Sequence, residues 1–270
     1  MSRIEVKKTY KLFINGAFPR SESGRVYEVA NSKGQFIANP ALASRKDLRD
    51  SVVAARAAFP KWSASTAYLR GQIIYRIAEM LEGRKEQFEA ELKSIGDKSK
   101  IDDAIDLIVW YAGWSDKLSA LNGVTNPVSG PFYNFTTPEA LGVIGVISKT
   151  DFLNFIDSLI SVIVSGNSAV IVAPGALAVP AMSFAEVLAT SDLPAGVANI
   201  LTGKVDELAP WMASHMDIDG LDVSGTKKTA ELKKSGAENL KRIHEFSQVK
   251  HPARILAFME AKTVWHTVGI

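Results

Sequence analysis

The side chains that usually carry enzyme chemistry are scarce in this sequence of 270 residues. It contains no cysteine, which rules out disulfides, thiolate metal sites and a cysteine nucleophile within these residues. The histidines do not show the HxxxH spacing with which one helix face binds zinc. They are His215, His244, His251 and His266. The sequence therefore predicts neither thiol chemistry nor a metal site.

One short turn could attract an anion. Ser224, Gly225 and Thr226 separate an apolar run from a predicted helix, and the free amides at a helix N-terminus favour negative charge. Lys227 and Lys228 follow directly and would favour the same charge. The alternative interpretation is that both lysines are the solvated start of a helix.

Composition excludes several other classes of protein. The formal net charge is +2, which is too close to zero to indicate a nucleic acid or a membrane surface as a partner. No apolar run reaches the ~20 residues that a membrane-spanning helix needs. The first residues lack the apolar stretch and cleavage site of a secretory signal. We therefore expect a cytoplasmic protein without nucleic-acid or membrane partners.

The second half of the sequence indicates the framework that positions these residues. Short β-branched runs alternate there with stretches of helical periodicity. The expected strands are 141–148, 168–172, 197–201 and 218–223, and the expected helices are 152–164, 180–189, 206–214 and 226–234. This alternation is typical of a parallel sheet covered by helices on both faces. The predicted fold class is α/β with a doubly wound parallel sheet.

Three helices are predicted in the first half. Ser44 and Asp47 are spaced to start the first one, and Pro60 is expected to end it. The other two are expected over 70–95 and 101–121, the latter closed by Asn122-Gly123.

Three further segments predict β-structure or a loop. Residues 11–18 contain Asn15-Gly16, a pair that suits the tight turn of a β-hairpin. The polar stretch 31–44 indicates a loop. Residues 262–266 predict a strand that does not belong to the alternating pattern.

Six stretches, in this order, resemble the aldehyde dehydrogenase family: YKLFINGAF, LGVIGVIS, SGNSAVIVAPGA, LPAGVANILTG, LDVSGT and MEAKTVWHTVGI. No stretch is specific alone, but their order and spacing are. The resemblance implies a dinucleotide-binding-type domain with N-terminal helices over residues 1–245. It implies a connection and a protruding C-terminal β-arm over residues 246–270. In the family this arm forms a sheet between subunits.

The same resemblance indicates that catalytic parts are missing. In the family, the region matching residues 227–261 holds a whole catalytic domain with the nucleophilic cysteine. The asparagine that stabilises the oxyanion corresponds to Asp151, whose carboxylate would oppose developing negative charge. A shifted alignment would place Asn154 there instead. No serine or threonine stands beside a base that could replace the thiolate.

The cofactor positions are also altered. The lysine and glutamate that hold the adenosine ribose in relatives correspond to Ala173 and Ala176, with Pro174 retained. The remaining cofactor candidates are vestigial and consist of Pro174 with the turn Ser224, Gly225 and Thr226. Binding of NAD or NADP is therefore left open.

Three functions follow as hypotheses. The first is a non-catalytic subunit or pseudoenzyme, which forms homo-oligomers, or hetero-oligomers with a full-length aldehyde dehydrogenase, through the C-terminal arm. The second is the family's NAD(P)-dependent aldehyde oxidation. The third is a nucleotide-binding regulatory module without chemistry. An unpaired edge strand is a liability, so the retained arm favours the first hypothesis.

Overall fold

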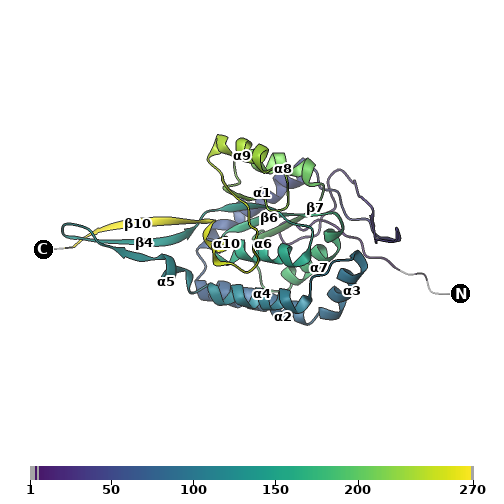
Figure 1. The fold of residues 1–270 in the computed structure, drawn as a ribbon, viewed down its shortest axis with the longest axis horizontal. Helices are drawn as coiled ribbons and strands as arrows, with labels where there is room; N and C mark the ends of the chain where they lie inside the picture. The colour runs from purple at the N-terminus through teal and green to yellow at the C-terminus, as the bar shows by residue number, and fades with distance from the viewer. Residues whose placement is uncertain (1–3, 5, 269–270) are drawn as a thin grey trace.

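A parallel five-stranded sheet forms the centre of the molecule in a computed structural model that describes residues 4 and 6–268 (Figure 1). The strand order is β7-β6-β5-β8-β9. The strands are β5 (Val143–Ile147), β6 (Ser168–Pro174), β7 (Ala198–Gly203), β8 (Gly220–Asp222) and β9 (Arg242–His244). Strands β5 and β7 are buried along their whole length, as continuous apolar runs predict.

Helices cover both faces of the sheet (Figure 1). One face carries α1 (Arg45–Ser63), α8 (Val205–Ser214) and α9 (Thr229–Gly236); the other carries α6 (Phe152–Val164) and α7 (Ala178–Ala189), with α2 (Ala67–Glu82) and α4 (Ile101–Trp114) packed outside them. Alternate residues of β5 face the two layers, since Ile144 belongs to one core and Val143 to the other. The doubly wound α/β prediction is confirmed.

Helix α1 begins as predicted but ends later. The Ser44 side chain accepts from the amide of Asp47, and the Asp47 side chain accepts from the amide of Ser44, which is a complete capping box. The helix continues through Pro60 to Ser63. A tertiary contact holds this last turn, because the buried Trp62 indole donates to the Ile163 carbonyl oxygen at 2.9 Å.

The two long helices predicted next are each divided. Residues 70–95 form α2 and α3 (Lys85–Ile95), separated at Gly83 and Arg84, where the Arg84 guanidinium pairs with Glu186 of α7 at 2.6 Å. Residues 101–121 form α4 and α5 (Leu118–Asn122). Helix α5 ends at Asn122 with Gly123 as its C-cap, as predicted, and Gly123 is extended with φ of −88°. Among the helices described here, none is both long enough and apolar enough to span a membrane.

The predicted N-terminal hairpin is present but short. Asn15 and Gly16 have φ of 53° and 72°, and Ile14 bridges Ala17 as the sequence predicts. The pairing continues one step further, since the Leu12 amide donates to the Pro19 carbonyl oxygen at 3.0 Å. On the other edge of this segment, Phe13 bridges Ile200 of β7. The predicted loop 31–44 contains β2 (Phe36–Ala38), which pairs with β1 (Val29–Ala30).

A second, antiparallel sheet extends from the body as an arm (Figure 1). Its order is β10-β4-β3, with β3 (Val124–Asn126), β4 (Phe132–Ala140) and β10 (Met259–Thr267). Strand β10 contains the predicted segment 262–266 and lies outside the parallel sheet, as expected. It pairs over its whole length with β4, a strand that the sequence did not predict. The division of the chain at residue 245 stays a prediction.

Candidate functional site

The order of the parallel strands reverses at β5. The chain passes through β6 to β7 on one side of β5 and returns to β8 and β9 on the other. In open α/β sheets, ligands bind at such a reversal, outside the carboxyl ends of the strands. Residues 148–151 follow β5 and residues 223–226 follow β8. The predicted positions Asp151 and Ser224 therefore lie on the two loops beside the reversal.

Gly225 holds its loop directly against the end of β5. Its amide donates to the Ile147 carbonyl oxygen at 2.9 Å. A Cβ at this position would lie 2.0 Å from the carbonyl oxygen of Ser148. The missing side chain therefore allows two backbone segments to pack together. A role of this turn in cofactor binding stays a prediction.

The helix after this loop begins later than predicted. Helix α9 starts at Thr229, because the Thr226 hydroxyl accepts the Lys228 amide at 3.2 Å and closes a separate turn. The Lys228 ammonium pairs with Asp206 of α8 at 2.9 Å, and its side chain is half exposed. These contacts favour the interpretation of the lysines as a solvated surface.

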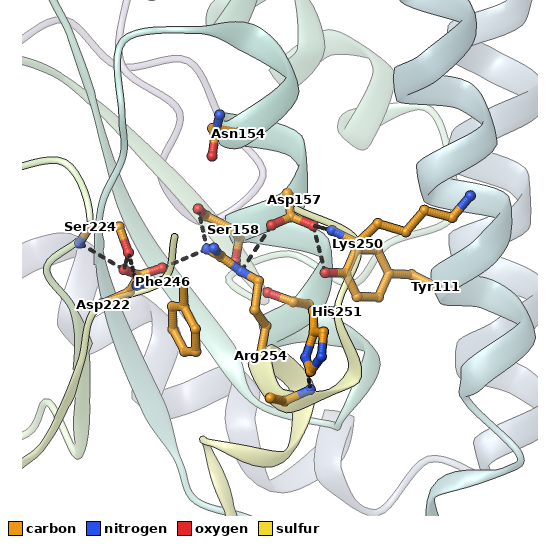
Figure 2. Close-up of polar contacts among 12 residues, drawn as sticks. Tyr111, Asn154, Asp157, Ser158, Asp222, Ser224, Phe246, Lys250, His251 and Arg254 are labelled. Carbon is orange, nitrogen blue, oxygen red and sulfur yellow. Dashed lines mark hydrogen bonds and ion pairs between the residues drawn. The ribbon is translucent and has the colours of Figure 1, made fainter. Parts of the chain in front are cut away.

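A buried ionic cluster lies beside the loop, on the α6 side of the sheet (Figure 2). Arg254 is 1% exposed and lies between two carboxylates. Its Nε is 2.9 Å from an oxygen of Asp157 on α6, and its Nη2 is 2.8 Å from an oxygen of Asp222 at the end of β8. Its Nη2 also donates to the Ser158 hydroxyl at 2.7 Å. One guanidinium thus joins helix α6 to strand β8.

Burial is the main influence on the pKa values of the two carboxyls in this cluster. It raises the pKa of Asp157 and of Asp222 above the usual range, and the charge of Arg254 opposes this rise. Asp157 also accepts from the Tyr111 hydroxyl at 2.7 Å and from the Lys250 amide at 2.9 Å. Burial raises the pKa of Tyr111 as well, so its phenol remains a neutral donor to the carboxylate.

Ser224 belongs to this cluster and not to an open site. Its hydroxyl and its amide both donate to the Asp222 carboxylate. The same hydroxyl oxygen accepts the Phe246 amide at 2.8 Å, and the Phe246 ring centroid lies 4.4 Å from the guanidinium carbon of Arg254. The hydrogen-bonding capacity of the Ser224 side chain is therefore used inside the protein.

The raised pKa values predict a pH dependence of stability. Folding favours the protonated carboxyls, so this stabilisation is complete below the unfolded pKa of about 4 and is lost as the pH rises through the folded values. Replacing Asp222 by asparagine removes one of these titrations. We expect the free energy of unfolding of D222N to gain relative to wild type as the pH rises, by at most about 1.4 kcal/mol per pH unit.

Urea unfolding, followed by circular dichroism from about pH 4 to about pH 7, measures this difference. Asp103 is exposed on α4, so D103N serves as the control and should run parallel to wild type. A D222N curve that stays parallel to wild type, or that falls relative to it, would contradict the prediction.

Arg254 comes from the stretch that the sequence resemblance identifies as the connection before the C-terminal arm. Residues 245–258 cross the end of β8 and pass along α6, with α10 (Pro252–Leu256) packed on that helix. The His251 ring accepts the Ala253 amide at 3.1 Å and caps α10 (Figure 2).

Two sequence signals could have revealed the cluster. Asp157 is the lone acid in the apolar helix 152–164, and Arg254 directly precedes the apolar run ILAF; a buried charge requires such a partner.

Asp151 and Asn154, the two alternative oxyanion positions, both lie at the N-terminus of α6. Asp151 caps the helix by accepting the Asn154 amide at 3.0 Å. The Asn154 side-chain amide donates to both Asp151 oxygens, at 2.9 Å and 3.0 Å. The two alternative oxyanion positions therefore bind each other. Asp151 as a degenerate oxyanion position stays a prediction.

Two more side chains cap the same helix end. The Phe152 amide donates to Asp97 at 2.7 Å, and the Leu153 amide donates to the Ser99 hydroxyl at 3.2 Å. The first three amides of α6 are thus taken, and carboxylates at a helix N-terminus are electrostatically stable. A negatively charged reaction intermediate would meet these two carboxylates, Asp97 and Asp151, at close range.

A cavity of about 720 Å³ lies at the carboxyl ends of β5 and β6. It brings together Asp151 and Pro174, whereas the predicted turn at Ser224 is not among its lining residues. Ala173 is fully buried in the sheet, and Ala176 lines the cavity with a methyl group only. Neither alanine therefore offers a hydrogen-bonding side chain to a ribose, although Lys98, Ser99 and Thr150 also line the cavity. Binding of NAD or NADP stays a prediction.

A doubly wound parallel sheet with loops meeting at the strand reversal is the architecture of dinucleotide-binding domains. The model of the aldehyde dehydrogenase family matches residues 18–266. The chain belongs to the aldehyde dehydrogenase family, as the sequence resemblance predicts.

Relatives and solved structures extend well beyond this chain. Retinal dehydrogenase 2 of Mus musculus is 32% identical over 256 residues, which are 89% of this chain and 48% of that protein. Mitochondrial 10-formyltetrahydrofolate dehydrogenase of Homo sapiens is 28% identical over 261 residues, which are 90% of this chain and 28% of that protein. The chain spans about half the length of the first of these relatives.

Solved structures show the same fold. The crystal structure of PnpE from Pseudomonas sp. WBC-3 has a TM-score of 0.80 and 25% identity, over 88% of this chain and 50% of that chain. An aldehyde dehydrogenase from Bacillus cereus, solved as its NAD+ complex, has a TM-score of 0.79 and 24% identity, over 90% of this chain and 53% of that chain.

Proposed function

We propose that this chain is a non-catalytic member of the aldehyde dehydrogenase family that acts as a subunit in an assembly. The observation that carries the proposal is the buried contact of Arg254 with Asp157 and Asp222. The resemblance places a catalytic domain in the region of residues 227–261, and here a residue of that region joins α6 to β8. The 270 residues also contain no cysteine.

The arm supports the assembly part of this proposal. Strand β10 is an edge of its three-stranded sheet, and nearly all of its residues are exposed. Trp265 is 60% exposed and Tyr133 49% exposed, although large apolar side chains are normally buried. A free edge of nine residues with exposed aromatics favours pairing with another strand. The proposed partner is a second copy, or the arm of a full-length family member, in the cytoplasm.

Light scattering after size exclusion tests the assembly. We expect wild type to elute at a multiple of the chain mass, 29.2 kDa, and the double variant Y133S/W265S to elute as a monomer. Tyr68 is 70% exposed on α2, so Y68S is the matched control and should assemble like wild type. A monomeric wild type that also fails to co-elute with a full-length family member would overturn the proposal.

An activity measurement distinguishes this proposal from aldehyde oxidation. The pure protein is expected to form no NADH from NAD and an aldehyde. Heat-sensitive formation of NADH that thiol reagents do not affect would support an oxidoreductase instead. In that case a nucleophile other than a thiolate would have to attack the aldehyde carbonyl. Binding of NAD or NADP without turnover would support the nucleotide-binding module.

A further inference from the structure

A basic cavity lies at the end of the molecule opposite the arm, among the N-terminal segments (purple in Figure 1). Its volume is about 440 Å³, within the range of small-molecule sites. Five cationic residues line it, and no aspartate or glutamate in the described part of the chain does. They are Lys7, Lys8, Lys11, Arg20 and Arg25. The whole chain has a net charge of only +2, so this concentration of one sign is local.

Among the described residues, acidic neighbours pair with two of these cations. Lys8 pairs with Glu186 at 2.7 Å, and Arg25 pairs with Glu207 at 3.3 Å. Within the described residues, Lys7, Lys11 and Arg20 form no ion pair. Like charges around one cavity repel each other, and protein surfaces usually intersperse the two signs. The excess of three positive charges would favour a bound anion.

The cavity also has an apolar wall. Phe36, Ile37 and Ala38 of β2 line it together with Tyr10. The Lys7 ammonium lies 4.8 Å from the centroid of the Phe36 ring. A ligand with both phosphate groups and an organic part would contact the cations and this wall together.

Backbone hydrogen bonds hold the cavity walls in place. The Ala41 amide donates to the Tyr10 carbonyl oxygen at 2.9 Å, and the Leu42 amide donates to that of Arg25 at 2.9 Å. The Tyr27 hydroxyl donates to the Gly175 carbonyl oxygen at 2.9 Å, which ties this region to the end of β6. The walls thus need little rearrangement on binding, and preorganisation lowers the cost of association.

We propose that the cavity lined by Lys7, Lys11 and Arg20 binds a small organic molecule that carries adjacent phosphate groups, with its organic part against β2. The site lies apart from the loops at the strand reversal and from the arm. It is therefore independent of the proposed assembly function. Arg20 supplies a planar fork that matches two phosphate oxygens, and the lysines supply point charges.

Isothermal titration calorimetry with ADP and with inorganic pyrophosphate tests this site. We expect saturable binding of both, and tighter binding of ADP, because only ADP has a ring for the apolar wall. The double variant K11Q/R20Q should weaken ADP binding by about tenfold or more. Both side chains form no ion pair in the described part of the chain, so the variant should keep the melting temperature of wild type.

A control variant that loses the same two positive charges elsewhere distinguishes binding at this cavity from general electrostatic attraction of ADP to the protein. Lys61 and Arg76 are exposed on α1 and α2, and K61Q/R76Q should bind ADP as wild type does. Pyrophosphate binding as tight as ADP binding would identify the inorganic anion as the ligand and overturn the role of the apolar wall. No saturation at millimolar ADP, or an equal loss in both double variants, would overturn the site. The single variant R20Q gives the same comparison if K11Q/R20Q is unstable.

Discussion

Replacing Arg254 by methionine is expected to lower the free energy of unfolding by about 3–5 kcal/mol. Methionine keeps much of the apolar volume but leaves Asp157 and Asp222 without their shared cation. Both carboxyls are buried, and an uncompensated buried charge costs far more than an exposed one. Urea unfolding of R254M, with the slope compared to that of wild type, measures the loss.

Two further variants separate this charge effect from general damage. Arg76 forms an exposed pair with Glu79 at 3.3 Å, and exposed pairs contribute at most about 1 kcal/mol. We therefore expect R76M to stay within about 1 kcal/mol of wild type. The triple variant R254M/D157N/D222N removes both orphaned charges and should recover part of the loss. A triple variant less stable than R254M would show that the charges are not the cause.

Replacing Gly225 by alanine is expected to destabilise the protein by about 3 kcal/mol or more, the upper range for overpacking. The added Cβ would lie 2.0 Å from the Ser148 carbonyl oxygen and 2.6 Å from that of Ile147. Both atoms belong to the backbone at the end of β5, so no side-chain rotation relieves the contact. Thermal unfolding in the absence of any nucleotide measures the effect.

Gly113 provides the matched control. It lies in α4, and a Cβ there would meet no atom within 4 Å. G113A should therefore stabilise the protein, by about 0.5–1 kcal/mol, because alanine loses less backbone entropy than glycine in a helix. If G225A melted like wild type, the loop would be free to move away from β5. The vestigial cofactor role of this turn would then regain support.

The parallel part of the fold was predictable because its information is local. The helix over 152–164 matches α6 to the residue, since its apolar residues and its flanking Asp151 lie within one continuous stretch. The capping box at Ser44 and Asp47 was predictable for the same reason. The predicted helix ends were wrong where contacts with residues far away in the sequence decide where a helix ends. Trp62 extends α1 by its contact with Ile163, and Glu186 holds the break at Arg84.

Strand β4 was missed because its burial is not periodic. Most of its residues are half-buried or exposed on both faces, so no alternation of apolar and polar residues marks it. It also contains Pro138, which argues against a strand. The pairing with β10 places Pro138 opposite Ala261 and Phe132 opposite Thr267, and only the complete chain supplies that partner.

The sequence by itself determined the α/β class, the membership that its ordered motifs indicate, and the lack of a thiol nucleophile. Tertiary structure alone decided what replaces the missing chemistry. Arg254 meets Asp222, 32 positions away, and Ser158, 96 positions away. Local periodicity shows that a charged residue is buried, but it does not say which distant partner neutralises it. Desolvation makes that pairing necessary, and chain topology selects the partner by bringing the end of β8, α6 and residues 245–258 together.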